Sequence, residues 1–355
     1  MAVGIYIGST ASYSGKNMIV MGISLKLQKE GYKIGYMKPI GALPKDMDGK
    51  LGDDDAFCVQ SVLGLSDEPS LVTPVLITQD FKVKALHGDT LDYLPTIKKA
   101  YVQLSRDKDI MIVAGSGGMY TGRYSQLTGV RIVQKLDLKA LVIDRLYKEL
   151  NYDFLAVLKD TLKEAMLGAI LNDIPANLMN EVELLIKPFL ERTGIKVLGI
   201  VPKDPLMGAI KISELAERLG GKIISAHNKA EKVVESFLIG SMQVENFLTH
   251  FRKSKNSAVI VGGDRSDVQL VALEGNCPCL VLTGNLYPNN IILTRSEILS
   301  VPIVVVRKDT YSVAKTMETI LSSHKLRSAI KIKQGAQLIS SSLDFDYLKA
   351  QLGLV

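Results

Sequence analysis

Residues 8–17 read Gly-Ser-Thr-Ala-Ser-Tyr-Ser-Gly-Lys-Asn, and this stretch decides the expected fold. Residues 3–7 before it are apolar and rich in β-branched side chains, which is typical of a buried strand. Residues 18–30 after it have the periodicity of a helix. A strand, a short loop of small residues and a helix form the arrangement in which backbone N–H groups bind phosphate. The stretch therefore predicts a phosphate-binding loop at the start of an α/β domain.

The loop departs from the usual G-x-x-x-x-G-K-[ST] pattern at two positions. Gly15 and Lys16 supply the close backbone approach and the cation, but Thr10 stands at the first glycine. Asn17 replaces the hydroxyl that ligates Mg²⁺. The alternative is a small-residue turn with an incidental lysine. We expect the phosphate or nucleotide contacts to come from Ser12, Tyr13, Ser14, Gly15, Lys16 and Asn17.

The composition is that of an ordinary folded protein. The chain has 355 residues, 47% hydrophobic and 23% charged, with a net charge of +6, so it has room for two or three domains. The basic residues are scattered, which argues against a nucleic-acid partner. Three cysteines argue against a disulfide scaffold, and no stretch resembles an export signal or a membrane span. We expect a cytoplasmic protein with no membrane partner.

Residues 1–205 repeat a strand–helix alternation. This alternation predicts a largely parallel sheet flanked by helices, of the P-loop NTPase-like kind. In such sheets ligands bind beyond the carboxyl ends of the strands, so the loops after the strands are the places to search. The six expected strands are Val3–Ile7, Ile34–Met37, Ile110–Val113, Ala140–Ile143, Gly168–Leu171 and Val197–Val201.

Two prolines within residues 202–205 end this pattern and indicate a domain boundary. Residues 206–322 predict a second, smaller α/β domain with strands at 222–225, 258–261, 279–282 and 303–306. These strands are apolar enough to be buried on both faces, yet few helices accompany them, which predicts a homodimer formed through 206–322. Residues 323–355 are expected to be a helical tail, with a Ser-rich connector at 340–342 and an amphipathic helix at 344–352.

Lys38 and the acidic run Asp53-Asp54-Asp55 follow the second expected strand. Lys38 could reach phosphate together with Lys16, although a lysine at a strand end is as easily an ordinary surface charge. The acids begin an expected helix at 54–62, where carboxylates cap the first turn. A carboxylate here could instead bind Mg²⁺. The residues alone do not decide whether Lys38 is a phosphate contact or a surface charge, or whether the acids are helix caps or Mg²⁺ ligands.

Two further loops follow strands of the first domain. Residues 115–118, Gly-Ser-Gly-Gly, allow backbone such as Gly117 to approach a ligand, or merely form a turn. The strand before them ends in Ala114, where an NTP hydrolase commonly has an acid that holds the metal. Asn172 could hydrogen-bond a base edge or could be a turn residue ahead of Pro175.

The second domain has one loop of interest, Gly262-Gly263-Asp264-Arg265-Ser266-Asp267. Asp264 or Ser266 could cap the following helix. Arg265, beside Asp264 and Asp267, could form an internal ion pair or contact an anion.

Taken in order, these motifs resemble the dethiobiotin synthetase-like P-loop proteins followed by a DRTGG domain. This pairing is that of the N-terminal region of long-form phosphotransacetylases and of free-standing proteins labelled cobyrinic acid a,c-diamide synthase-like. The resemblance covers residues 3–322, and its motifs are 14–16, 36–39, 54–56, 115–118, 168–172, 197–202, 263–267 and 309–311.

The resemblance implies roles for single residues. It implies that Lys16 binds phosphate, that Lys38 lies at substrate and phosphate, that Asp55 binds metal and that Asn172 reads adenine. Asn17 and Ala114 depart from the pattern. Because two of three protein oxygens are lost, Mg²⁺ binding is expected to be weak, whereas ATP or another nucleotide can still bind.

These observations favour a regulatory sensor that binds a nucleotide or another anionic metabolite and acts on an enzyme partner or its own oligomer. The alternative is an ATP-dependent ligase or synthetase that uses Mg-ATP. Acetyl transfer is not expected, because the resemblance places that catalytic domain further along and the sequence stops at Val355.

Overall fold

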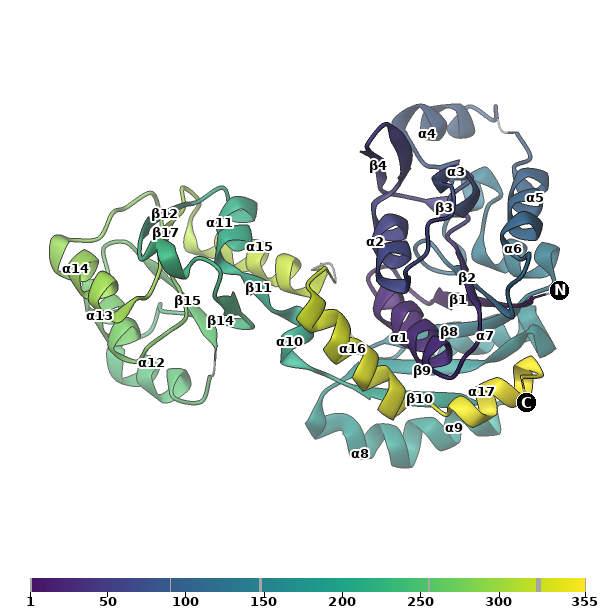
Figure 1. The fold of residues 1–355 in the computed structure, drawn as a ribbon. Helices are drawn as coiled ribbons and strands as arrows, with labels where there is room; N and C mark the ends of the chain where they lie inside the picture. Colours follow the sequence, from purple (N-terminus) through teal and green to yellow (C-terminus); the bar gives the residue numbers. More distant parts are fainter. Residues whose placement is uncertain (1, 90, 147–148, 255, 324–326, 355) are drawn as a thin grey trace. The chain divides into compact units, whose positions relative to one another are not determined.

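A computed structural model describes residues 2–89, 91–146, 149–254, 256–323 and 327–354 (Figure 1). The chain divides into two compact units. The first contains residues 1–203 together with 326–355, and the second contains residues 204–325. Each unit has its own sheet and its own hydrophobic core. In the described residues, no helix is both long and apolar enough to cross a lipid bilayer.

The first unit is built on a six-stranded parallel sheet of order β10-β9-β8-β1-β7-β2. The parallel sheet expected from residues 1–205 is therefore confirmed. All six expected strands are present, and most extend one to three residues beyond their expected ends. The strands are β1 (Val3–Ser9), β2 (Ile34–Met37), β7 (Ile110–Ala114), β8 (Lys139–Arg145), β9 (Met166–Ile174) and β10 (Val197–Pro202).

Helices cover both faces of this sheet. The principal ones are α1 (Lys16–Lys29), α2 (Asp54–Leu63), α5 (Leu94–Leu104), α6 (Gly129–Leu136) and α7 (Tyr152–Leu162). Shorter elements are α3 (Pro69–Val72), α4 (Gln79–Leu86), α8 (Met179–Glu181), a π-helical turn (Val182–Ile186) and α9 (Lys187–Arg192). The small strands β3 (Ile40–Gly41) and β6 (Val75–Leu76) pair with each other, as do β4 (Pro44–Met47) and β5 (Lys50–Asp53).

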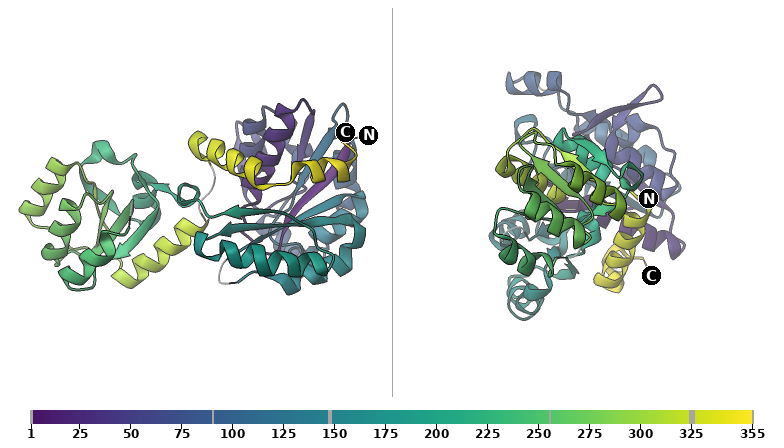
Figure 2. Two further views of the ribbon diagram at one scale, coloured as in Figure 1. Left: turned by 90° about the horizontal axis from the view of Figure 1, so that it is seen from below. Right: turned by 90° about the vertical axis from the view of Figure 1, so that its left-hand side faces the viewer.

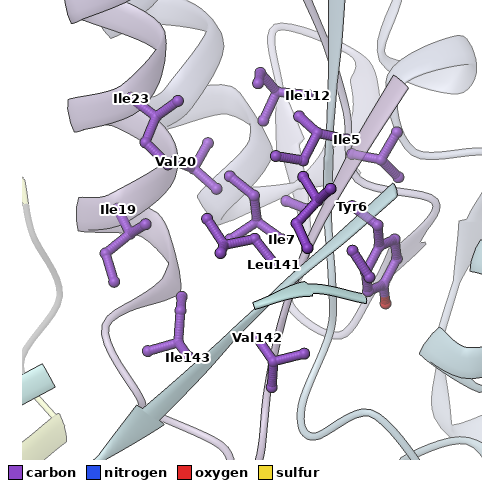
Figure 3. Close-up of a cluster of buried hydrophobic side chains, with 14 of the residues drawn as sticks. Ile5, Tyr6, Ile7, Ile19, Val20, Ile23, Ile112, Leu141, Val142 and Ile143 are labelled. Atoms are coloured by element: carbon purple, nitrogen blue, oxygen red, sulfur yellow. The ribbon is translucent and has the colours of Figure 1, made fainter. Parts of the chain in front are cut away.

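The centre of the first core lies around β1, because successive side chains of a strand point to opposite faces. Ile5 and Ile7 face α1, which contributes Ile19 and Ile23 to the same layer (Figure 3). Tyr6 points to the opposite face (Figure 3). All of these side chains are at most 3% exposed. The buried strand and helix fix the position of the loop between them.

The C-terminal segment is part of the first unit. It forms α16 (Ala329–Ser342) and α17 (Phe345–Leu352), and residues 340–342, expected to be a connector, are the last turn of α16. α16 packs on α1 so closely that a Cβ at Gly22 would lie 2.6 Å from Ile339. Leu343 pairs with Gly199 on the edge strand β10. Figure 2 shows both helices, in yellow, beside the elements of the first unit. The expected separate tail is thus structurally a layer of this unit.

The second unit has a five-stranded sheet of order β12-β17-β16-β15-β14, with β12 antiparallel to β17 and the other pairs parallel. Its strands are β12 (Lys222–Ser225), β14 (Ser236–Ile239), β15 (Ser257–Gly262), β16 (Leu280–Thr283) and β17 (Ile303–Val305). α10 (Pro205–Gly208) and the strand pair β11 (Ile210–Lys211) and β13 (Val233–Val234) precede or flank it.

Both faces of this second sheet are covered within the single chain. α11 (Ile212–Leu219) and α15 (Thr310–Ser323) pack on one face, which includes Ile260 and Val281. α12 (Val244–Phe251), α13 (Ser266–Glu274) and α14 (Asn290–Leu299) pack on the other (Figure 1). The sequence-based reason for a dimer, an uncovered sheet face, is therefore wrong, because α12 and α14 were not expected.

Candidate functional site

The loop between β1 and α1 has the geometry expected of a phosphate-binding loop. Gly15 is the N-cap of α1 and has a left-handed backbone, with φ of 88°. A Cβ at this position would lie 2.4 Å from Nδ2 of Asn172, so only glycine fits. No side chain of the described residues caps α1, which leaves the N–H groups of its first turn directed at the loop. Such a helix N-terminus favours an anion.

The loop is held from inside by hydrogen bonds. The buried hydroxyl of Ser14 donates to the carbonyl of Ala11 at 2.8 Å. Asn172, at the carboxyl end of β9, donates from Nδ2 to the carbonyl of Ser14 at 2.9 Å. Ser12 and Tyr13 are exposed at the tip, and Tyr13 has a left-handed φ of 57°. Asn172 therefore contacts the loop itself.

Lys16 lies against two neutral oxygens. Its Nζ donates to Oγ of Ser9 at 2.7 Å and to the carbonyl of Gly117 at 2.7 Å. The structure thus brings together two of the expected site residues, Lys16 and Gly117. Burial, followed by the positive charge of Lys38, lowers the pKa of Lys16 to about 8, and the charge of Asp55 opposes this. A partly buried ammonium that contacts neutral groups can be stabilised further by an anion.

Lys38 is buried in an ion-pair cluster at the start of α2. Its Nζ lies 2.7 Å from Oδ1 of Asp53 and 3.3 Å from Oδ2 of Asp55. Asp53 is the N-cap of α2, because its carboxylate accepts from the backbone N–H groups of Asp55 and Ala56. For Asp53 the capping role is therefore the one present in the structure, and Lys38 is no ordinary surface charge.

Asp55 is engaged on both carboxylate oxygens. Oδ2 faces Lys38, and Oδ1 accepts from Nη2 of Arg327 at 2.8 Å. Asn17 adds a side-chain hydrogen bond. Burial alone would raise the pKa of Asp55, but Lys38, Arg327 and Asn17 outweigh it and the pKa is lowered. Asp55 is thus an ionised carboxylate whose negative charge is already balanced by Lys38 and Arg327.

The residues present do not fit the Mg²⁺ that the family resemblance implies. Ala114, at the end of β7, offers only a methyl group, and Asn17 is directed to Asp55. Among the described residues, no three acidic, histidine or cysteine side chains are arranged to hold a metal ion. We therefore derive no step through a metal at this place.

Sequence reasoning missed two charged residues at the end of β8. Asp144 is fully buried and accepts from the hydroxyl of Thr10 and, at 2.7 Å, from the backbone of Asn151. Burial raises the pKa of Asp144 despite these hydrogen bonds. Arg145 donates to the carbonyl of Tyr13 at 2.8 Å. Both residues support the phosphate loop. The expected strand ended at Ile143, so these two positions were not recognised as strand-end residues.

The expected site loop of the second unit contains an internal ion pair. Nε and Nη2 of Arg265 both donate to the carboxylate of Asp267 at 2.9 Å, and Nη2 also contacts the carbonyl of Met242. The hydrogen bonds from Arg265 lower the pKa of Asp267 to about 2. The expectation that Asp264 or Ser266 caps α13 is wrong. Arg265 occupies the N-cap position without a side-chain cap, and Asp264 is exposed.

Two protein families match this chain. Residues 3–211 match the family described as an AAA domain, and residues 214–320 match the family described as a DRTGG domain. The chain therefore has a P-loop domain followed by a DRTGG domain, as the resemblance implied.

The chain is similar to two kinds of curated relative. It is 22% identical to the phosphate acetyltransferase of Synechocystis sp. over 373 residues, which cover 98% of this chain and 52% of the relative. It is 28% identical to the ATP-dependent dethiobiotin synthetase BioD of Clostridium kluyveri over 204 residues, which cover 57% of this chain and 74% of the relative. The chain thus spans about half the length of the acetyltransferases it matches.

Among solved structures, the chain is similar to the CBS and DRTGG domains of the regulatory region of Clostridium perfringens pyrophosphatase, complexed with diadenosine tetraphosphate. The likeness has a TM-score of 0.29 and 12% identity, and covers 44% of this chain and 76% of that one.

Proposed function

This chain belongs to the AAA domain family, and we propose that it is a regulatory protein that binds a nucleotide at residues 10–17 without catalysing its hydrolysis. One observation carries the proposal. Within the part of the chain that the structure describes, Lys16 donates its hydrogen bonds to two neutral oxygens, beside a helix N-terminus that no described side chain caps. This combination attracts phosphate and needs no metal.

Among the described residues no three acidic, histidine or cysteine side chains are arranged to hold a metal ion, and this supports binding over catalysis. Phosphoryl transfer depends on a divalent cation that neutralises charge between the phosphates. Here the strand-end position is Ala114, and Asp55 is already paired with Lys38 and Arg327. Nucleotide affinity can persist under these conditions because Lys16 and backbone N–H groups supply it.

A bound nucleotide would exchange one set of contacts for another. The ammonium of Lys16 would leave Oγ of Ser9 and the carbonyl of Gly117 for a phosphate oxygen. Because an ammonium attracts an anionic phosphate oxygen more strongly than a neutral oxygen, the exchange favours the bound state. The loop 115–118 would then lose its hydrogen bond from Lys16, and a change in this loop is a way in which nucleotide binding could affect a partner.

The direct test is calorimetric titration of the whole chain with ATP, ADP and GTP, with and without Mg²⁺. We expect binding of at least one nucleotide with an affinity that Mg²⁺ changes little. No binding of any of the three would contradict the proposal.

The alternative function is an ATP-dependent ligase, favoured by the retained Lys38 and by similarity to a dethiobiotin synthetase. The two differ in turnover. Hydrolysis by the wild type at about 1 per second or more would favour the enzyme. The sensor proposal expects slow or no hydrolysis, and a rise in Mg²⁺-dependent hydrolysis when Asn17→Thr and Ala114→Glu are combined. Ala114→Gln with Asn17→Thr is the control of equal size without the charge.

We also propose that the chain works in the cytoplasm as a homodimer and acts on an enzyme partner. For the dimer the remaining support is on α14, where Ile291 and Ile298 are 72% and 66% exposed. Light scattering should give a dimer for the wild type and a monomer for Ile291→Glu/Ile298→Glu. A monomeric wild type at micromolar concentration would overturn it.

A further inference from the structure

The start of α2 holds an arginine that is far away in the sequence. Nη2 of Arg327 lies 2.7 Å from Oδ2 of Asp54 and 2.8 Å from Oδ1 of Asp55, and also contacts the carbonyl of Asp54 at 3.3 Å. A single nitrogen thus bridges two carboxylates. Arg327 belongs to the segment that returns to the first unit after the second, directly before α16. Nothing in the proposed nucleotide contacts uses this residue.

Each acid of this cluster is paired with at least one cation. Among the residues that the structure describes, the ion pairs of Asp53, Asp54 and Asp55 involve three cations. Lys38 neutralises Asp53 and one oxygen of Asp55 from the buried side. Lys45 contacts Asp54 from the exposed side. The cations are Lys38, Lys45 and Arg327.

Arg327 places a positive charge between the carboxylates of two adjacent acids, Asp54 and Asp55. Asp54 and Asp55 would be the residues to hold a cation here, because carboxylate oxygens are the ligands that Mg²⁺ and Ca²⁺ prefer. A guanidinium supplies its charge as directed N–H bonds and accepts no further anionic ligand in the manner of a metal ion.

A buried hydroxyl lies within electrostatic reach of the same acids. Tyr36 is fully buried, and its hydroxyl has no hydrogen-bond partner among the described residues. Burial, followed by the charges of Asp53 and Asp55, raises its pKa. A buried polar oxygen without a partner is uncommon in a folded protein.

We propose that Arg327 takes the place of a divalent cation between Asp54 and Asp55 and thereby makes this site independent of metal. The replacement of a cation by Arg327 concerns Asp54 and Asp55 alone. The independence from metal rests on the proposed function, because it concerns the affinity for nucleotide. Arg327 is thus a residue that determines which cation the site uses.

The first experiment uses Mn²⁺ alone, without nucleotide. Electron paramagnetic resonance titration measures Mn²⁺ binding to the whole chain and to Arg327→Ala. We expect the variant to bind Mn²⁺ at least about fivefold more tightly, because the competing cation is gone. Adding Asp55→Asn to Arg327→Ala should abolish the gain. Equal Mn²⁺ binding by the wild type and Arg327→Ala overturns the proposal.

Matched variants separate occupancy of the position from loss of charge. Lys45→Ala removes the same charge from the same cluster but leaves Arg327 between the two carboxylates. We therefore expect little gain in Mn²⁺ affinity for Lys45→Ala, and an equal gain would contradict the proposal. Arg327→Lys keeps a cation and should behave more like the wild type. If Arg327→Ala unfolds, judged by circular dichroism, Arg327→Met provides the same comparison with the side-chain stem retained.

The second experiment is calorimetric titration with ADP, with and without Mg²⁺. We expect Mg²⁺ to strengthen ADP binding by Arg327→Ala and to leave the wild type unchanged. The two failures are distinguishable. If the wild type binds no nucleotide, the proposed function fails, while the Mn²⁺ titration still tests the role of Arg327. If the wild type binds ADP but the variant gains no Mn²⁺ site, only the inference fails.

Discussion

The loop of residues 10–15 and the loop of residues 263–265 each follow a parallel strand and lead into a helix, β1 into α1 and β15 into α13. Each carries a cation near the start of its helix. In the first unit Lys16 donates to two neutral oxygens. In the second unit Arg265 is paired through two nitrogens with Asp267. Equal topology therefore does not make equal sites, because an anion gains most from a cation that no carboxylate has already neutralised.

The largest effect expected from this comparison is that of Lys16→Ala. Because it removes a charge-assisted contact, nucleotide affinity should fall by at least about 1.5 kcal/mol, which is more than tenfold. Calorimetric titration measures the loss, and Lys29→Ala, at the exposed end of the same helix, is the control. Equal affinities for the wild type and Lys16→Ala would show that residues 10–17 are not the nucleotide site.

The next effect is a dependence on pH. The pKa of Lys16 is about 8 in the ligand-free protein, lowered by burial and then by Lys38. As the pH rises from 7 to 9 the protonated fraction falls about tenfold, so nucleotide affinity should fall by about the same factor. Titrations at pH 7, 8 and 9 measure the slope. Lys16→Arg should flatten it, because a guanidinium stays charged. An equal slope in both proteins would assign the titration to another group.

A smaller effect is expected for Asn172→Ala. The buried amide supports the carbonyl of Ser14, so its loss should weaken binding by about 1 kcal/mol, or about fivefold. Because the role of Asn172 is to hold the loop, the affinities for ATP and for GTP should fall equally. A loss confined to ATP would instead indicate that Asn172 reads adenine. Comparative titration with both nucleotides distinguishes these roles.

The smallest effect is expected for Arg265→Ala. This ion pair is confined to the second unit and is partly exposed, so nucleotide affinity at residues 10–17 should stay within about twofold of the wild type. Asp267→Ala is the matched variant from the other side of the pair. A tenfold change in either variant, measured in the same titration, would show that the second loop takes part in nucleotide binding.

Elements with a strong local pattern could be predicted from the sequence. β2 was predicted at its observed bounds, and the loop at Gly15 was recognised from its strand–loop–helix context. Both elements have local signals, because the pattern of apolar and small residues along a short segment indicates a buried strand or a turn. α16 was expected only as part of a helical tail, and its last turn was taken for a connector, because residues 340–342 are serines, which weaken a helix. It packs closely on α1 at Gly22, and tertiary packing of this kind supplies most of the stability of helices in proteins.

The charged part of the site was predictable only in part. Lys38 and Asp55 were recognised as candidate site residues. Whether Lys38 is a phosphate contact or a surface charge, and whether the acid is a helix cap or a metal ligand, stayed open because the sequence does not show which charged side chains contact one another. Arg327 lies more than 270 positions from Asp54 and Asp55, and its contact depends on the return of the chain to the first unit. No local pattern carries that information. Asp144 was missed for a simpler reason, since its strand is longer than its apolar run.

The insertion of the second unit between residues 203 and 326 has a consequence for synthesis on the ribosome. α16 and Leu343, which cover α1 and the edge strand β10, are made only after the second unit. At about 5–20 residues per second, the roughly 120 intervening residues take about 6–25 s to translate. During that time the nascent first unit has an apolar helix face and an unpaired sheet edge, both of which attract chaperones or other chains. The second unit, although later in sequence, can therefore complete its fold first.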